Sequence, residues 1–97
     1  MDILKPAMAG TLESSDAQIL VEPNEEGIEL LLSSSVMNQY GRQIKATVLE
    51  TLERLDVKNA RVTVVDKGAL DCTIRARVGA AAFRAAESTD FAWEVRK

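Results

Sequence analysis

Two adjacent serines, Ser14 and Ser15, are the side chains of this chain best suited to covalent chemistry. They lie between the acids Glu13 and Asp16 in a short segment that begins at Gly10. A serine needs a nearby base to become a nucleophile, and the 97-residue chain has no histidine to supply one. The same hydroxyl is still a good acceptor for a group that another enzyme attaches. We therefore predict a modification site at these serines and not an active site.

The simplest alternative is that the segment is only a polar turn before a strand, with Asp16 forming a local side-chain hydrogen bond. Composition alone favours this alternative, because paired serines are too common to name a function. A further hypothesis concerns the charges of Glu13 and Asp16. They could guide a modifying enzyme or repel wrong partners.

The other reactive residue types offer weaker sites. Cys72 is the single cysteine, and Leu70 and Ile74 at alternate positions predict that its thiol is buried and inert. A transition-metal site has no histidine or second cysteine to build it. Asp66 and Asp71 are too few oxygen ligands for a hard cation. We expect no catalytic residue and no metal.

Charge and hydropathy narrow the class of partner. A net charge of −3 and a pI near 4.9 argue against nucleic-acid binding. Arg75, Arg77 and Arg84 cluster, but acids follow them, so they are interpreted as a solvated face. The chain has no apolar run of about 18 residues and no signal-peptide pattern, which predicts no membrane span. Together with the lone cysteine, these features predict a cytoplasmic protein.

The elements that must position the serines begin with two strands. Apolar residues alternate along 17–22 and again along 28–33, and residues 23–27 between them are rich in turn formers. We predict a β-hairpin from these segments. The preceding residues, 1–16, are expected to form an extended or irregular arm that carries the acceptor serine.

A helix is predicted from Val36 to Leu55, with an N-cap among the serines 33–35 and Asn59 as a left-handed residue after its end. Glu50 and Arg54 stand four residues apart, in the order that favours an ion pair. The apolar stripe of this helix consists of Met37, Tyr40, Ile44, Val48, Leu49, Leu52 and Leu55.

The second half of the chain predicts two more strands and a second helix. Residues 61–65 are rich in β-branched residues, and 70–78 alternate again, whereas the alanine-rich run 80–86 favours helix. In the tail, 88–97, three apolar residues alternate and could form an edge strand or a docking element. They are Phe91, Trp93 and Val95.

The expected fold is a single small α+β domain over residues 1–97, in the order ββαββα. Its sheet is expected to be four-stranded and mostly antiparallel, with the helices on one face. This order differs from a ferredoxin-like fold and from the helical bundle of a phosphopantetheine carrier.

Several segments resemble the acyl carrier protein of citrate lyase, the gamma subunit of that complex. The similarity covers nearly the whole chain in order, and the blocks 10–16 and 66–77 are the most specific. The segments that carry it are Ala7–Asp16, Ile28–Leu30, Ser34–Val36, Gln39–Gly41, Asp66–Cys72 and Arg75–Arg77.

The resemblance implies a covalent cofactor, phosphoribosyl-dephospho-CoA, joined through a phosphodiester to Ser14, with Ser15 as the second choice. It also implies a non-catalytic carrier that holds acetyl and citryl thioesters while citrate is cleaved to acetate and oxaloacetate. The implied partners are the alpha (acyl transferase) and beta (citryl lyase) subunits, a prosthetic-group loading enzyme and an acetyl-loading ligase.

Two other functions stay open. The chain could be the corresponding carrier subunit of a malonate decarboxylase-type complex, whose prosthetic group is of the same kind. It could also be an unmodified interaction or regulatory module that docks through its tail. Replacing Ser14 separates a carrier from a module, because only a carrier needs that hydroxyl.

Overall fold

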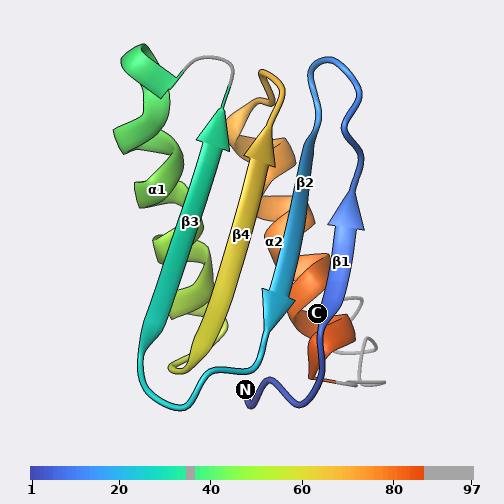
Figure 1. Cartoon of the computed structure of the whole chain (residues 1–97), viewed down its shortest axis with the longest axis vertical. Helices are drawn as coiled ribbons and strands as arrows, with labels where there is room; N and C mark the ends of the chain where they lie inside the picture. The colour runs from blue at the N-terminus through green and yellow to red at the C-terminus, as the bar shows by residue number, and fades with distance from the viewer. Residues whose placement is uncertain (35–36, 87–97) are drawn as a thin grey trace.

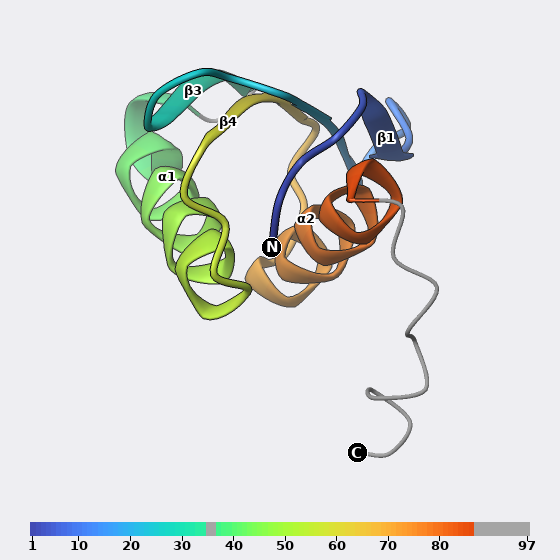
Figure 2. The same cartoon turned by 90° about the horizontal axis from the view of Figure 1, so that it is seen from below.

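The computed structural model describes residues 1–34 and 37–86, and these form a four-stranded sheet with two helices. Figure 1 shows the strands side by side in the order β1-β2-β4-β3. Seen from below in Figure 2, both helices lie on the same face of the curved sheet. The elements in chain order are β1 (Ala7–Gly10), β2 (Ala17–Glu22), β3 (Ile28–Ser34), α1 (Met37–Arg54), β4 (Ala60–Asp66) and α2 (Asp71–Ala85).

The sheet is mixed, and its strand pairing corrects the predicted hairpin. β2 is antiparallel to both β1 and β4, whereas β3 runs parallel to β4. The strands predicted at 17–22 and 28–33 exist, but β4 lies between them instead of their pairing with each other. Alternation identifies a strand and its buried face, but it does not identify the neighbouring strand. The helix α1 provides the long crossover that a parallel β3–β4 pair requires.

The first strand lies within the segment that was expected to be an arm. Residues 7–10 pair with β2 from Ala7 opposite Val21 to Gly10 opposite Gln18. Ala9 is buried against the helices' side of the sheet. Four residues of alanine, methionine and glycine are too short a run to show a period of two, so the partner strand determines this element.

The predicted strand 70–78 is wrong, because these residues belong to α2. Its buried residues follow helical spacing, at Ile74, Val78, Ala81, Ala82 and Ala85. Ile74 and Val78 are four residues apart, a spacing compatible with a period of two and with one of 3.6. The alternation along 70–78 was therefore ambiguous, and the helix-favouring alanines and arginines decide the outcome.

The helix α1 confirms the predicted helix, with Ile44, Val48 and Leu52 buried as expected. Tyr40 and Leu49 are exposed instead of completing the stripe. On the inner face Thr47 and Thr51 are buried in their place, and the Thr51 hydroxyl donates to the Thr47 carbonyl at 2.8 Å. A threonine bonded within its own helix can face a core without leaving its hydroxyl unpaired.

The end of α1 also differs from the prediction. Asp56, not Asn59, takes the left-handed conformation, with φ of 58°. Asn59 instead accepts a hydrogen bond from the Gly27 amide at 2.7 Å through its side-chain oxygen. The predicted ion pair between Glu50 and Arg54 is confirmed at 3.9 Å. Of the serines 33–35 among which the N-cap was predicted, Ser33 and Ser34 belong to β3, and residue 35 lies outside the described residues.

The α+β class, the four-stranded sheet and the placement of both helices on one face are thus as predicted, although β1 takes the place of the strand predicted at 70–78. The core consists of the inner sheet face and the inward stripes of α1 and α2. No helix of the described residues is both long and apolar enough to cross a membrane. The alternating tail residues Phe91, Trp93 and Val95 lie outside the described part of the chain, and the single domain over 1–97 stays a prediction.

Candidate functional site

The predicted acceptor serines lie in the turn that joins β1 to β2. We call residues 11–16 the acceptor turn. Ser14 and Ser15 are both exposed. Ser15 takes a left-handed conformation with φ of 67°, an uncommon geometry for a residue with a side chain. Ser14 is exposed, and its hydroxyl has no hydrogen-bond partner among the described residues.

The backbone of the acceptor turn is fixed on one side by the loop after β4. The Ser15 amide donates to the Lys67 carbonyl at 2.8 Å, and the Lys67 amide donates to the Asp16 carbonyl at 2.9 Å. Within the turn, the Asp16 amide donates to the Glu13 carbonyl at 3.1 Å. The Glu13 amide donates to the Thr11 hydroxyl at 3.2 Å. These bonds order the backbone on both sides of Ser14.

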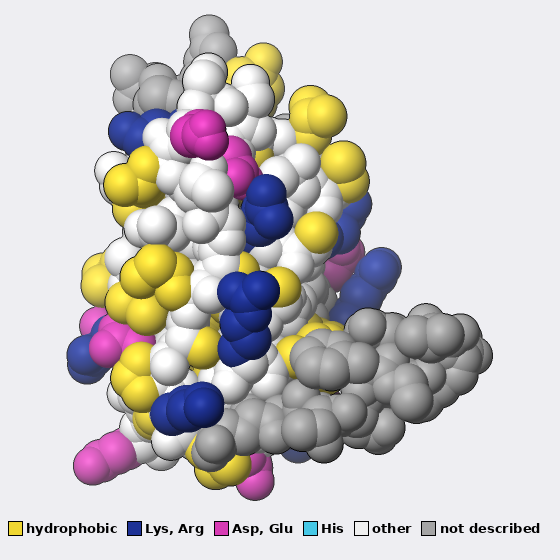
Figure 3. Space-filling model, turned by 90° about the vertical axis from the view of Figure 1, so that its right-hand side faces the viewer, with side chains coloured by type: hydrophobic (Ala, Val, Ile, Leu, Met, Phe, Trp, Pro, Cys, Tyr) yellow, Lys and Arg dark blue, Asp and Glu magenta, His cyan; other side chains and the backbone are white. Residues whose placement is uncertain are grey.

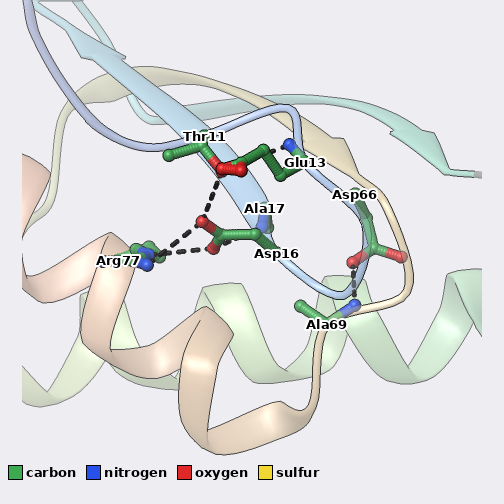
Figure 4. Close-up of polar contacts among 7 residues, drawn as sticks. All are labelled: Thr11, Glu13, Asp16, Ala17, Asp66, Ala69 and Arg77. Atoms are coloured by element: carbon green, nitrogen blue, oxygen red, sulfur yellow. Dashed lines mark hydrogen bonds and ion pairs between the residues drawn. The ribbon is translucent and has the colours of Figure 1, made fainter.

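On its other side the turn is held by Asp16, which Figure 4 shows at the centre of a polar network. Its carboxylate accepts two hydrogen bonds from Arg77 of α2, from Nε at 3.0 Å and from Nη2 at 3.1 Å. It also accepts from the Thr11 hydroxyl at 2.7 Å and from the Ala17 amide at 2.7 Å. The bond to Ala17 confirms the predicted local bond of Asp16.

These bonds stabilise the ionised form of Asp16. The Arg77 hydrogen bonds first, and then those from Thr11 and the Ala17 amide, hold the pKa of the carboxyl well below its usual range. The guanidinium of Arg77 offsets the negative charge of Asp16, and the guiding role suggested for Glu13 and Asp16 stays a prediction. Arg77 was interpreted from the sequence as part of a solvated face. Its bonds to Asp16 correct that interpretation.

The strand β1 ends at Gly10, directly before the acceptor turn, at a position where only glycine fits. Its φ is +89°, and a Cβ placed there would lie 1.8 Å from the Ala17 carbonyl oxygen and 3.2 Å from Cδ of Arg77. The two ends of the turn therefore approach each other with no room for a side chain between them. This close approach, together with Arg77 and Lys67, is the part of the site that sequence reasoning missed.

Basic side chains of α2 are directed toward β1 as well as toward the turn. Arg84 donates to the Met8 carbonyl at 2.7 Å, while Arg77 reaches Asp16. In Figure 3, the view from the β1 side, several lysine and arginine side chains lie along this side of the molecule. Arg77 and Arg84 thus hold β1 and the acceptor turn against α2.

The weaker candidates occupy other positions. Cys72 is exposed on α2, which corrects the prediction that it is buried. Asp66 is buried and accepts hydrogen bonds from the Ser34 hydroxyl at 2.8 Å and the Ala69 amide at 2.9 Å. Asp71 accepts a hydrogen bond from the side-chain Nε2 of Gln43 at 2.9 Å. The described residues contain no group of three or more potential metal ligands.

Similarity to known proteins covers nearly the whole chain. A family model described as the malonate decarboxylase delta subunit (MdcD), an acyl carrier protein, matches residues 4–85. The citrate lyase acyl carrier protein of Vibrio cholerae serotype O1 (strain M66-2) is 54% identical over 94 residues, which is 96% of each chain. That of Lactiplantibacillus plantarum is 52% identical over 95 residues, covering 98% of this chain and 99% of the relative. Citrate lyase acyl carrier protein 2 of Salmonella paratyphi A is 55% identical over 94 residues, covering 96% and 97%.

A solved structure supports the fold. A chain in the crystal structure of a Pseudomonas malonate decarboxylase hetero-tetramer in complex with malonate superposes with a TM-score of 0.65. The match covers 87% of this chain and 91% of that one at 22% identity, so it bears on the fold alone. With full-length relatives at 50–55% identity, this chain belongs to the family of small acyl carrier proteins that includes the citrate lyase acyl carrier proteins and the malonate decarboxylase delta subunit.

Proposed function

We propose that this chain is the acyl carrier subunit of a citrate lyase complex, and that Ser14 carries its prosthetic group. The observation that carries the proposal is the exposed hydroxyl of Ser14, which has no hydrogen-bond partner among the described residues and lies in a turn whose backbone is held on both sides. The relatives named citrate lyase acyl carrier protein support the carrier role. A bulky covalent group needs a hydroxyl that faces solvent, and this site provides one.

The group we propose is phosphoribosyl-dephospho-CoA in a phosphodiester link. Attachment forms a bond from Ser14 Oγ to a phosphorus atom of an activated donor of this group. The bond between that phosphorus and the phosphate that leaves the donor breaks. The hydroxyl proton goes to a base of the loading enzyme, since this chain has no histidine. When bound, the group supplies a terminal thiol that carries acyl groups as thioesters.

This chain's own contribution is tethering. A substrate linked to Ser14 reaches neighbouring active sites at an effective concentration set by the length of the arm. The chain contributes no acid, base or oxyanion site to the chemistry, which belongs to the cofactor and to the partner subunits. We propose that the alpha and beta subunits transfer and cleave the acyl group, and that a loading enzyme and an acetyl-loading ligase prepare the carrier in the cytoplasm.

Between the two serines, local geometry favours Ser14. The Ser15 amide is bonded to Lys67, and its left-handed backbone restricts how the residue moves. Ser14 has neither restraint, so it adapts more easily to a partner's active site. Ser15 remains the second choice.

The runner-up function is the carrier subunit of a malonate decarboxylase-type complex. The family model and the superposed Pseudomonas chain favour it, because both are described with malonate decarboxylase. The higher identity to full-length citrate lyase carriers favours the citrate system. An unmodified interaction module has no specific structural observation in its favour.

The decisive experiment is the intact mass of the chain after co-expression with the loading enzymes, followed by peptide mapping. We expect a mass gain equal to phosphoribosyl-dephospho-CoA on the peptide containing Ser14. Ser14→Ala should abolish the gain, and Ser15→Ala, one residue away in the same turn, should retain it. The opposite pattern would move the site to Ser15. No gain in any sample, with the enzymes active on a known carrier, would contradict the proposal.

A further inference from the structure

The bond between Arg77 and Asp16 joins the acceptor turn to a helix that lies 61 residues away in sequence. A guanidinium that donates two hydrogen bonds to one carboxylate fixes orientation as well as distance. The Asp16 side chain is only 14% exposed and that of Arg77 is 39% exposed, so the pair is partly shielded from water. Partial shielding makes the pair stronger than an ordinary surface ion pair.

Asp16 has four hydrogen-bond donors on its two carboxylate oxygens. Two come from Arg77 and two from Thr11 and Ala17, which stand at the beginning and just past the end of the acceptor turn. Four donors saturate the lone pairs of a carboxylate. These four hydrogen bonds, which we call the clasp, hold the two ends of the acceptor turn together. Arg77 is the one member of the clasp that lies outside the β1–β2 segment.

The clasp touches the ends of the turn and leaves its exposed part free. None of its bonds uses the Ser14 hydroxyl. A turn held in this way presents Ser14 in one geometry before any enzyme binds. Preorganisation of this kind lowers the entropy cost of binding, because the ordering is complete in advance.

We propose that Arg77 is a positioning residue for modification of Ser14: by holding Asp16 it keeps the acceptor turn in the conformation that the loading enzyme binds. This inference rests on the proposed function of Ser14 as acceptor. Without Arg77 the turn opens part of the time, and only the closed fraction binds the enzyme. The apparent affinity of the loading enzyme for the carrier is therefore the affinity for the closed form multiplied by the closed fraction. The chemical step at Ser14 is unchanged.

The test is the kinetics of loading of purified carrier, followed by intact mass with the loading enzyme and its activated donor. For Arg77→Gln and for Asp16→Asn we expect KM for the carrier to rise roughly 10-fold, with kcat unchanged. Arg77→Lys keeps the charge but loses the two-bond geometry, so its KM should be intermediate. In the double variant KM should rise no further than in either single variant, because both changes break the same contact.

Arg75→Gln is the matched control. Arg75 lies two residues earlier in α2 and pairs with Glu50 at 3.9 Å, away from the turn. Its replacement should leave KM unchanged. All variants are compared at a temperature where circular dichroism shows them fully folded, so that a loss of global stability does not enter the kinetics.

A second readout does not depend on loading. The Ser15 amide, which bonds to Lys67, should lose most of its protection against hydrogen exchange in Arg77→Gln, because a roughly 10-fold rise in KM corresponds to a turn that is closed only about a tenth of the time. Unchanged KM together with unchanged exchange in folded Arg77→Gln would overturn the inference, as would faster exchange with normal KM. If the unaltered chain itself gains no mass, the proposed function fails instead, and the two failures are thereby distinguished.

Discussion

At the scale of single residues, Gly10 and Gly68 form a natural comparison. Both have φ of +89°, a conformation that a side chain disfavours. A Cβ at Gly68 would meet nothing within 4 Å, whereas at Gly10 it would collide with the backbone of Ala17. A side chain would thus be strained by the backbone at both positions, and at Gly10 it would also meet the close approach of Ala17.

Replacement of each glycine by alanine separates these two effects. Gly68→Ala should lower the free energy of unfolding by about 1–2 kcal/mol, the cost of a left-handed alanine. Gly10→Ala should cost about 3 kcal/mol or more, since the strand ends must also move apart. Urea denaturation at pH 7 measures both. Equal losses would show that the close approach at Gly10 is easily relieved.

Asp16 gives the fold a pH dependence at the same scale. Its folded-state pKa is lowered by the Arg77, Thr11 and Ala17 hydrogen bonds, relative to about 3.9 in the unfolded chain. Its contribution to stability is therefore fully present above the unfolded pKa and is lost as pH falls toward the lower folded value. Compared with Asp16→Asn, the native chain should be more stable by a constant amount from pH 5 to 8.

Below about pH 4 the advantage over Asp16→Asn should shrink steadily, since the carboxylate takes up a proton in the unfolded chain while it stays ionised in the folded one. Urea denaturation of both proteins across this range measures the difference in the free energy of unfolding. A difference that stays constant from pH 8 down to pH 2.5 would contradict the assignment of a stabilised carboxylate.

At the scale of elements, the sequence of α2 begins with a pattern that is also typical of a strand. Its first eight residues alternate in polarity, but burial follows the helical positions Ile74 and Val78. Cys72, which alternation places on the buried face, lies two residues before Ile74 and so falls on a different side of the helix. The thiol is exposed for that reason.

The exposure of Cys72 tests the helix directly. In the folded protein its thiol should react with a soluble disulfide reagent at a rate within about tenfold of that in denaturant. A thiol in the interior of a sheet would be protected by the free energy of opening, usually by several orders of magnitude. Ser in place of Cys72 provides the blank for the assay. Strong protection in the native state would contradict the helical assignment.

At the scale of the whole molecule, the sheet has one covered face and one open face. Both helices pack on the first (Figure 2). The strand register aligns residues of neighbouring strands on the second, and one row across the sheet is largely apolar. From β1 to β3 this row is Met8, Leu20, Thr63 and Leu31.

Leu31 and Leu32 of β3 report on the two faces. Leu31 is 50% exposed on the open face, whereas Leu32 packs against the core. Leu32→Ala should lower the free energy of unfolding by about 2 kcal/mol, and Leu31→Ala by less than about 1 kcal/mol. Chemical denaturation measures both. A loss for Leu31→Ala as large as for Leu32→Ala would show that the open face is covered in solution.

Much of the fold follows from local patterns. Strands β2, β3 and β4, the helix α1 and the Glu50–Arg54 pair were all predicted, because each depends on residues close in sequence. The short strand β1 and the partner of each strand were not predictable in this way. β1 forms because the free edge of β2 provides backbone hydrogen-bond partners for it. β3 lies beside β4 because the crossover through α1 places it there.

By itself the sequence determined the α+β class, the inward stripe of α1, the absence of a histidine base, and the exposed position of Ser14 in a polar segment. These properties depend on residue type and on the period of buried positions along the chain. Only the tertiary structure decided that β4 lies between β2 and β3, that Arg77 holds Asp16, and that Gly10 meets Ala17. Each of these contacts joins segments that share no local pattern, so their geometry depends on how the elements pack and not on the order of residues within them.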